Sequence, residues 1–142
     1  MLVGPSRYGK TAFARSLGLH VYVNTRWNAR LLSGANDPDV RYIVVDDIDS
    51  PSVLSDGRSG LDGTLSRRDC VIRQPWRSLL GGQVDITITD KYLKPLVLRG
   101  AMPLIFLANE ANDFSHDLCL SERDYFDKNV VRVDIMSPLF KQ

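Results

Sequence analysis

The sequence contains little cysteine and lacks a long apolar run. Only two of its 142 residues are cysteines, Cys70 and Cys119, which is too few for a disulfide scaffold and lacks the spacing of a metal site. No apolar run approaches the ~18 residues that a membrane-spanning helix requires, and the chain opens without the basic and apolar leader of a secretory signal. These absences predict an intracellular protein, not secreted and without a membrane partner, whose thiols are reduced.

Histidine is also scarce, and the net charge is close to zero. The two histidines, His20 and His116, are too isolated to suggest a metal site, and we interpret Trp27 and Trp76 as packing residues. The formal net charge is +1, but residues 58–100 carry 8 basic and 4 acidic side chains. This segment is the expected place of contact with a polyanion, although loop arginines that only keep the surface soluble would give the same count.

The remaining composition is that of an ordinary globular protein. Apolar residues make up 44% of the chain and charged residues 25%, and the length predicts a single domain over residues 1–142. We expect helices over residues 10–17 and 114–127, and a long loop rich in Ser, Gly, Asp and Arg over residues 49–75. The expected strands are 1–3, 21–23, 41–45, 84–89, 96–98, 104–107 and 130–135. This order of elements predicts an α/β fold with at least three strands of parallel type.

Two of these strands are expected to form a β-hairpin. Residues 84–89 alternate apolar and polar side chains, and residues 96–98 form a second apolar run. The turn between the two runs contains Lys91 and Lys94. The sequence therefore predicts a hairpin with a basic tip.

A glycine-rich loop near the start of the chain fits the phosphate-binding pattern G-x-x-x-x-G-K-[ST]. Its residues are Gly4, Pro5, Ser6, Arg7, Tyr8, Gly9, Lys10 and Thr11. The glycines allow backbone N–H groups to curve around an anion at the start of a helix. Lys10 can reach the β- and γ-phosphates of a nucleotide, and Thr11 can place its hydroxyl on Mg²⁺. A plain glycine turn before a helix is the alternative, but the expected strand and helix on either side are the context that the motif requires.

Two later strands end in polar residues that suit nucleotide chemistry. Asp46 and Asp47 follow the apolar run 43–45, so that Asp46 is expected to hold Mg²⁺ through water and Asp47 to polarise the attacking water. Asn109 follows the apolar run 104–108 and can hydrogen-bond the γ-phosphate or that water. The alternatives are a solvated acidic turn for the two aspartates and an ordinary turn for Asn109. The glycine-rich loop upstream disfavours the first alternative.

Four stretches of the chain, in this order, resemble the motifs of superfamily 3 helicases. They are residues 4–11, residues 44–48, residues 77–83 with 89–95, which look like the B′ motif, and residues 105–110. The similarity is closest to the helicase domain of replication initiator (Rep) proteins. These proteins serve circular single-stranded DNA viruses such as geminiviruses and genomoviruses, and related plasmids or genome-integrated copies. The resemblance covers nearly the whole chain.

This resemblance implies both a fold and an activity. The implied fold is a P-loop NTPase of the AAA-like kind, a three-layer sandwich with a central, mostly parallel sheet and a β-hairpin insertion. The implied function is the ATP-dependent DNA helicase domain of a rolling-circle replication initiator, which hydrolyses ATP with Mg²⁺ and translocates on single-stranded DNA. Such proteins work as homo-oligomeric rings, usually hexamers, and the family resemblance implies the host nucleus as the location.

The resemblance also assigns roles to the hairpin and to the strand ends. In the family the B′ hairpin points into the central channel, so that Lys91 and Lys94 become candidates for contact with the DNA backbone. An exposed basic turn without such a partner is the alternative. Lys10, Asp47 and Asn109 become the catalytic candidates of the chain itself.

A ring ATPase is further expected to receive an arginine finger from a neighbouring subunit. Arg123 lies after the motif at residues 105–110, where such a residue could sit, and Arg132 is the other option. The alternative for Arg123 is a surface ion pair with Glu122, Asp124 or Asp127.

The chain departs from the family pattern in two respects, and two other functions stay open. It lacks a His-rich metal motif, so we expect no endonuclease domain, and residues 50–73 look like an insertion of unknown role. A P-loop nucleotide kinase is the first alternative, with this insertion as a lid, but it leaves Asn109 and the basic hairpin unexplained. A non-enzymatic Rep remnant that binds nucleotide or DNA is the second.

Overall fold

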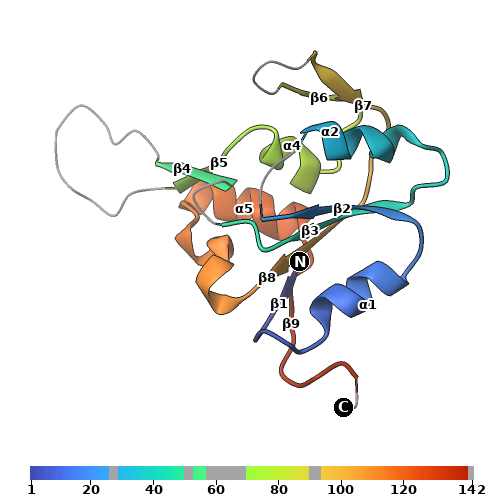
Figure 1. The fold of residues 1–142 in the computed structure, drawn as a ribbon. Coiled ribbons are helices and arrows are strands. Elements are labelled where there is room, and N and C mark those ends of the chain that lie inside the picture. Colours follow the sequence, from blue (N-terminus) through green and yellow to red (C-terminus); the bar gives the residue numbers. More distant parts are fainter. Residues whose placement is uncertain (26–28, 50–52, 57–69, 90–93, 141–142) are drawn as a thin grey trace, which may run out of the picture.

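A five-stranded parallel sheet forms the centre of the protein (Figure 1). The computed structural model describes residues 1–25, 29–49, 53–56, 70–89 and 94–140. The strands lie in the order β2 (His20–Asn24), β3 (Tyr42–Asp46), β8 (Leu104–Ala108), β1 (Leu2–Val3) and β9 (Val133–Asp134). Each of the described pairings within this sheet is parallel. The predicted α/β class with a mostly parallel central sheet is confirmed.

The register of the sheet brings the carboxyl ends of β1, β3 and β8 to one edge. Asp46 at the end of β3 pairs with Leu107 of β8, which in turn pairs with Leu2 of β1. Strand β3 is buried along its whole length, because its apolar residues are covered on both faces, as in other parallel sheets. Polar residues that follow these strands are therefore placed side by side, although they are far apart in the sequence.

Helices cover both faces of the sheet. Helix α1 (Lys10–Ser16) packs on one face, where Ala14, Tyr42, Val44 and Leu107 form a small apolar cluster. The other face carries the larger core, with α2 (Ala29–Leu32), α4 (Trp76–Leu80) and α5 (Leu120–Asn129). Figure 1 shows α1 on the opposite side of the sheet from α2 and α4.

A column of aromatic rings ties the larger core together. Trp76 meets Phe106 edge to face at 6.0 Å between ring centroids, Phe106 meets Phe114 at 5.2 Å, and Phe114 meets Phe126 at 5.9 Å. Such pairs add about 0.5–1.5 kcal/mol each beyond the burial of their area. The interpretation of Trp76 as a packing residue is confirmed, since 2% of its surface is exposed; Trp27 lies outside the described residues.

The long loop expected over residues 49–75 is wrong at both of its ends. Strand β4 (Leu54–Asp56) pairs antiparallel with β5 (Cys70–Ile72), and Val53, Leu54 and Ile72 are buried in the larger core. Isolated apolar residues in a polar stretch gave no periodic pattern, but tertiary burial was enough to order them. Residues 50–52 and 57–69, the rest of the supposed insertion, lie outside the described part of the chain.

Two other expected elements are shorter than the sequence indicated. The helix expected over residues 114–127 is divided into a 3₁₀ turn η3 (Phe114–Asp117) and α5, because Leu118 and Cys119 have extended backbones. The last strand, expected over residues 130–135, is limited to β9, because β1 offers it two pairing positions. The helix expected over residues 10–17 is confirmed as α1.

The predicted hairpin is present and is anchored by one side chain. Strands β6 (Ile86–Ile88) and β7 (Leu96–Leu98) pair antiparallel, while residues 90–93 lie outside the described residues. Asn36, in the 3₁₀ turn η1 (Ser33–Asn36), donates its Nδ2 to the carbonyl of Val97 at 2.8 Å. Its Oδ1 accepts from the N–H of Arg99 at 2.9 Å. These bonds fix the base of the hairpin against the body of the protein.

In the part of the chain that the structure describes, no helix combines the length and apolar character needed to cross a membrane.

Candidate functional site

The glycine-rich loop leaves β1 at the carboxyl edge of the sheet and leads directly into α1. The N–H of Gly4 donates to the carbonyl of Ala108 at 3.2 Å, so the loop starts against the end of β8. Gly9 precedes the helix with a φ of +86°, a left-handed conformation that glycine adopts at little cost. The N–H of Phe13 then donates to the carbonyl of Gly9 at 2.9 Å and closes the first helical turn.

Lys10 lies inside this loop and is 7% exposed. Its Nζ donates to the carbonyls of Gly4 at 2.6 Å and Pro5 at 2.8 Å, and to Oδ1 of Asn109 at 3.0 Å. Burial lowers the pKa of Lys10 from its ordinary value, and the charges of Asp46 and Asp47 oppose that shift. The structure thus places the predicted phosphate-binding lysine and the predicted sensor asparagine in direct contact.

Asp46 is the centre of a second set of hydrogen bonds. The carboxylate is buried at the end of β3, with 7% of the residue exposed. Its Oδ2 accepts from Thr11 Oγ1 at 2.7 Å and from the hydroxyl of Tyr22 at 2.8 Å. A carboxylate and a hydroxyl oxygen are ligands that Mg²⁺ accepts, and both described bonds occupy the same carboxylate oxygen. The donor set therefore fits the predicted Mg²⁺ site of Thr11 and Asp46.

Asp47 follows directly and has a different environment. It is exposed and has a φ of +51°, in the left-handed region that Asp tolerates better than most residues. The carbonyl of Asp46 accepts the N–H of Thr25 at 3.0 Å, which holds the backbone at the turn. A sparsely populated backbone conformation at such a position is a feature that functional sites often carry.

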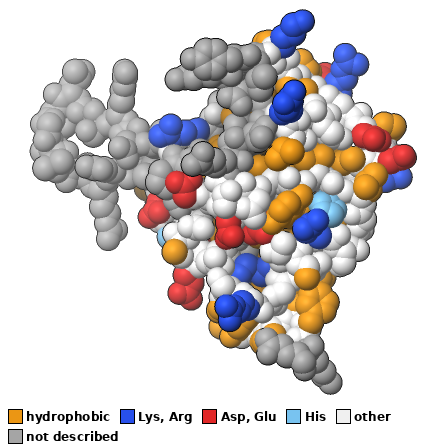
Figure 2. All heavy atoms as spheres, viewed as in Figure 1, with side chains coloured by type: hydrophobic (Ala, Val, Ile, Leu, Met, Phe, Trp, Pro, Cys, Tyr) orange, Lys and Arg blue, Asp and Glu red, His pale blue; other side chains and the backbone are white. Residues whose placement is uncertain are grey.

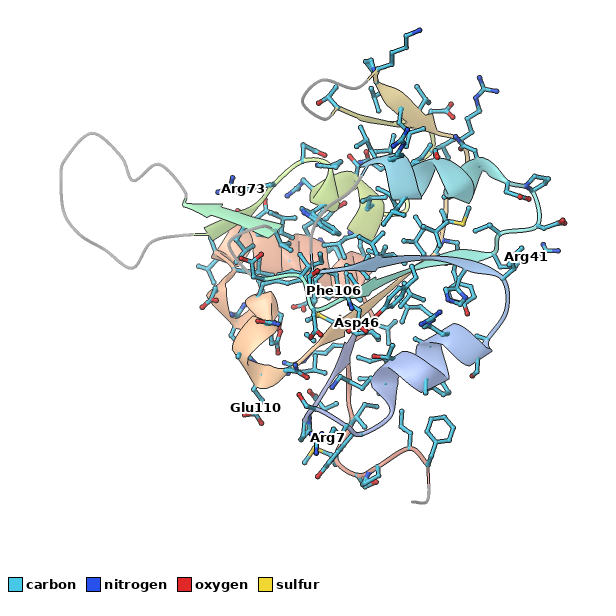
Figure 3. All side chains as sticks on the ribbon, in the orientation of Figure 1. Arg7, Arg41, Asp46, Arg73, Phe106 and Glu110 are labelled. Atoms are coloured by element: carbon cyan, nitrogen blue, oxygen red, sulfur yellow. The ribbon has the colours of Figure 1, made fainter. Side chains whose placement is uncertain are left out.

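All of the predicted strand-end residues face one cavity of about 370 Å³. It is lined by Ser6, Arg7, Gly9, Lys10, Thr11, Ala12, Asp46, Asp47 and Asn109. Figure 3 shows Arg7 on the loop that precedes α1 and Asp46 at the edge of the sheet nearby. In the space-filling view, acidic and basic side chains adjoin one another below the middle of the visible face (Figure 2). The cavity combines cationic and anionic groups with the backbone of a glycine loop, as a nucleotide–metal site requires.

The remaining residues of the motif support the loop from outside the cavity. Pro5 contributes its carbonyl to Lys10, as described above, and the carbonyl of Tyr8 accepts the N–H of Leu139 at 3.0 Å. A Cβ at Gly4 would lie 2.6 Å from the carbonyl oxygen of Ile135. Because backbone occupies that space, only glycine fits at position 4.

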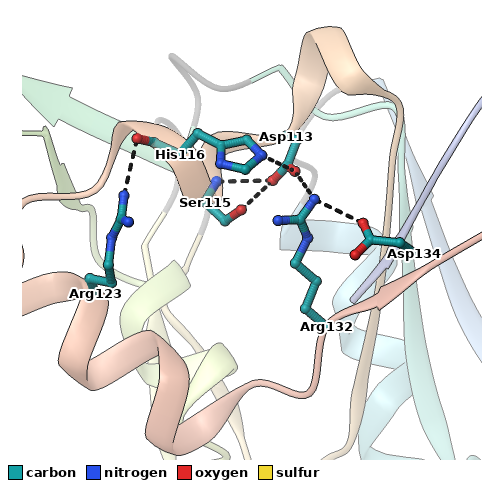
Figure 4. A network of polar contacts seen from close by, with 6 residues as sticks. All are labelled: Asp113, Ser115, His116, Arg123, Arg132 and Asp134. Atoms are coloured by element: carbon teal, nitrogen blue, oxygen red, sulfur yellow. Dashed lines mark hydrogen bonds and ion pairs between the residues drawn. The ribbon is translucent and has the colours of Figure 1, made fainter.

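The two candidate arginines lie in a different place and have different partners (Figure 4). The NH2 of Arg132 lies 2.9 Å from Asp113 Oδ2 and 2.9 Å from Asp134 Oδ1. Arg123 is exposed, and its NH2 donates to the carbonyl of His116 at 3.3 Å. Both arginines line a second cavity of about 380 Å³ and neither lines the cavity that contains Lys10.

Two of the three carboxylates that were expected as alternative ion-pair partners of Arg123 pair with other residues. Glu122 pairs with Arg77, and Asp124 pairs with Lys128 at 2.7 Å. Neither of these carboxylates is engaged with Arg123. Of the two lysines predicted to contact DNA, Lys94 is described and exposed, and Lys91 lies outside the described residues.

Sequence reasoning missed two groups of residues. Tyr22 and Asn24 lie on the edge strand β2, and the hydroxyl of Tyr22 contacts Asp46. Their spacing of two residues predicts that both side chains lie on one face of a strand, but the position of β2 beside β3 is visible only in the structure. The ion pair between the buried Asp113 and the partly exposed Arg132 was also missed, and no local pattern indicates it.

The fold and the cavity define a class of protein, an α/β protein with a parallel sheet and a glycine-rich loop that leads into a helix beside two aspartates. No family model matches the chain. It is 32% identical over 130 residues to the replication-associated protein of Tobacco yellow dwarf virus (strain Australia). The aligned segment covers 92% of this chain and 32% of that protein. The replication-associated protein of Bean yellow dwarf virus gives the same values.

A third relative comes from a further virus. The chain is 31% identical over 138 residues to the replication-associated protein of Maize streak virus genotype A (isolate South Africa). The aligned segment covers 96% of this chain and 32% of that protein. The chain thus spans about a third of the length of the curated relatives that it matches. The resemblance to replication-associated proteins of circular single-stranded DNA viruses is confirmed: this chain is homologous to a segment of those of geminiviruses.

Proposed function

We propose that this chain is the ATP-hydrolysing helicase domain of a rolling-circle replication initiator, with the P-loop NTPase fold of superfamily 3. The observation that carries the proposal is the convergence of Lys10, Thr11, Asp46, Asp47 and Asn109 on one cavity. The strand order supports it as well, because β8 lies between β1 and β3 and brings Asn109 to the loop.

Each residue of the cavity has a role in the proposed reaction. Lys10 exchanges its carbonyl partners for the β- and γ-phosphate oxygens of ATP and stabilises their charge. Thr11 and Asp46 hold Mg²⁺, which when bound neutralises charge on the phosphate oxygens. Asp47, exposed at the cavity wall, polarises the attacking water, and Asn109 orients that water or the γ-phosphate.

The proposal includes single-stranded DNA as partner and a ring of copies of this chain. Lys94 and Lys91, which lie between the two hairpin strands in the sequence, contact DNA phosphates. The relation to replication-associated proteins supports DNA as the ligand. Arg123 is the better candidate for a finger that enters a neighbouring site, because Arg132 is held by Asp113 and Asp134 within its own chain. The host nucleus is the proposed location.

The deciding experiment is the rate of ATP hydrolysis with and without single-stranded DNA. Hydrolysis that DNA stimulates is the expected result. Nucleotide binding without turnover would favour the non-enzymatic alternative, and phosphoryl transfer to a nucleoside monophosphate without stimulation by DNA would favour the kinase. Failure of ATP to bind at all would contradict the proposed function.

Replacing Lys94 with alanine is expected to weaken binding of single-stranded DNA at every sequence tested. Because one phosphate contact is lost, the slope of log K against log salt should fall by about 0.7. Fluorescence anisotropy of a labelled oligonucleotide over a salt series measures both effects. Lys128→Ala, which removes an exposed lysine of α5, is the control. An unchanged slope for Lys94→Ala would exclude this lysine from the interface.

A further inference from the structure

The hydroxyl of Tyr22 links the edge strand β2 to the carboxylate that the proposed function assigns to Mg²⁺. It donates to Oδ2 of Asp46 at 2.8 Å, the oxygen that also accepts from Thr11 at 2.7 Å. Tyr22 and Asp46 are 24 residues apart in the sequence and lie on neighbouring parallel strands. Asp46 is therefore held from two sides, by α1 through Thr11 and by β2 through Tyr22.

The direction of the Tyr22 hydrogen bond is fixed by a third residue. Nδ2 of Asn24 donates to the hydroxyl oxygen of Tyr22 at 2.8 Å. An amide nitrogen can only donate, so the hydroxyl oxygen accepts there and its proton is directed to Asp46. The result is a chain of donors that runs from Asn24 through Tyr22 to a buried carboxylate.

The ring of Tyr22 is also held in place. The guanidinium carbon of Arg15, on α1, lies 4.6 Å from the centroid of the ring, which is within the range of a cation–π contact. Arg15, Asn24 and Asp46 thus surround Tyr22 from three different elements, so its hydroxyl has a defined position. A donor in a defined position can set the orientation of the carboxylate that it contacts.

We propose that Tyr22 is a positioning residue of the metal site, whose hydroxyl fixes the Asp46 carboxylate so that its other oxygen, Oδ1, is presented to Mg²⁺. The inference rests on the proposed function, because that function makes Asp46 a ligand of Mg²⁺. Both described hydrogen bonds go to Oδ2, and neither competes for Oδ1. Residues that hydrogen-bond a metal ligand in this way typically change metal affinity by about 10–100-fold when they are removed.

The test is the Mg²⁺ dependence of nucleotide binding, with a fluorescent, non-hydrolysable ATP analogue as the probe. In Tyr22→Phe the ring and its contact with Arg15 remain and only the hydroxyl is lost. The half-saturating Mg²⁺ concentration is expected to rise about 10-fold, while binding of the analogue in EDTA is unchanged. Asn24→Ala, at an exposed position, is expected to give a smaller rise because it frees the hydroxyl to turn away.

Tyr42→Phe is the matched control. Tyr42 lies on the adjacent strand and its buried hydroxyl donates to the carbonyl of Ala14 at 2.7 Å, so the variant loses a comparable hydrogen bond away from Asp46. Its half-saturating Mg²⁺ concentration should equal that of the unchanged protein. Urea unfolding of both tyrosine variants reports any general loss of structure.

The outcomes separate this inference from the proposed function. A rise in Tyr22→Phe and Asn24→Ala, but not in Tyr42→Phe, supports the positioning role. Equal Mg²⁺ dependence in all variants, or an equal rise in both tyrosine variants, overturns it while the nucleotide site stands. Absence of Mg²⁺-dependent nucleotide binding in the unchanged protein overturns the proposed function and, with it, the role of Tyr22.

Discussion

Replacing Lys10 with alanine is expected to reduce ATP hydrolysis at least ~100-fold, because the transition state loses its main cationic partner from this chain. The lysine is 7% exposed, so water cannot replace its charge efficiently. Lys10 also donates to Asn109, which is 99 residues away in the sequence, so the variant removes a contact that holds a second catalytic candidate. The measurement is steady-state phosphate release at saturating ATP and Mg²⁺.

Two comparisons make the Lys10 result interpretable. Lys128→Ala removes a lysine whose side chain is 70% exposed and should leave the rate unchanged. Thermal unfolding of Lys10→Ala shows whether the loop still folds without the bonds to Gly4 and Pro5. A folded Lys10→Ala protein that hydrolyses ATP at the unchanged rate would contradict the assignment of this cavity as the catalytic site.

Replacing Arg132 with methionine is expected to lower the free energy of unfolding by about 3 kcal/mol, since it leaves a buried carboxylate without its main counter-charge. The side chain of Asp113 is 1% exposed and that of Arg132 is 30% exposed. Ser115 donates to Asp113 Oδ1 through its N–H at 3.0 Å and its hydroxyl at 2.6 Å, so Asp113 also caps η3 (Figure 4). The measurement is urea unfolding followed by circular dichroism.

An exposed ion pair of the same chain provides the control for Arg132→Met. Lys128 and Asp124 pair at 2.7 Å with side chains that are 70% and 65% exposed. Lys128→Met should therefore cost only about 0.3–0.5 kcal/mol. A similar small loss in Arg132→Met would show that Asp113 does not depend on Arg132, and that this pair does not hold the segment after β8 to β9.

The parts of the candidate site that could be predicted from the sequence are local. The glycine-rich loop was recognisable from its eight consecutive residues, because the positions of its glycines before a helix are enough to indicate a candidate anion site. Asp46 and Asp47 were recognisable because they end a continuous apolar run, and buried strands deliver such residues to one edge of a sheet. The hairpin followed from alternation in β6 and a second apolar run in β7. The extent of the domain over residues 1–142 stays a prediction.

The parts that could not be predicted depend on contacts between distant residues. Strands β4 and β5 lie in a polar stretch of the sequence, and they are held by contacts between distant residues: their antiparallel pairing and the burial of Val53, Leu54 and Ile72. The contact of Tyr22 with Asp46 requires β2 to lie beside β3, and no local pattern in the sequence of β2 predicts that neighbour. The contact of Arg132 with Asp113, on which the proposal of Arg123 as the arginine finger rests, likewise joins distant residues.

The sequence by itself indicated Lys10 and Thr11 as candidates for contact with phosphate and Mg²⁺, because the glycine-rich motif joins these residue types at short spacing. It also determined the α/β class, since the order in which apolar runs and helical segments follow one another can be recognised in the sequence. The tertiary structure alone decided the strand order, with β8 between β3 and β1, and thereby the contact of Lys10 with Asn109. The physical reason is that pairing between strands and burial of charge are energies of the folded chain as a whole, to which residues far apart in the sequence contribute together.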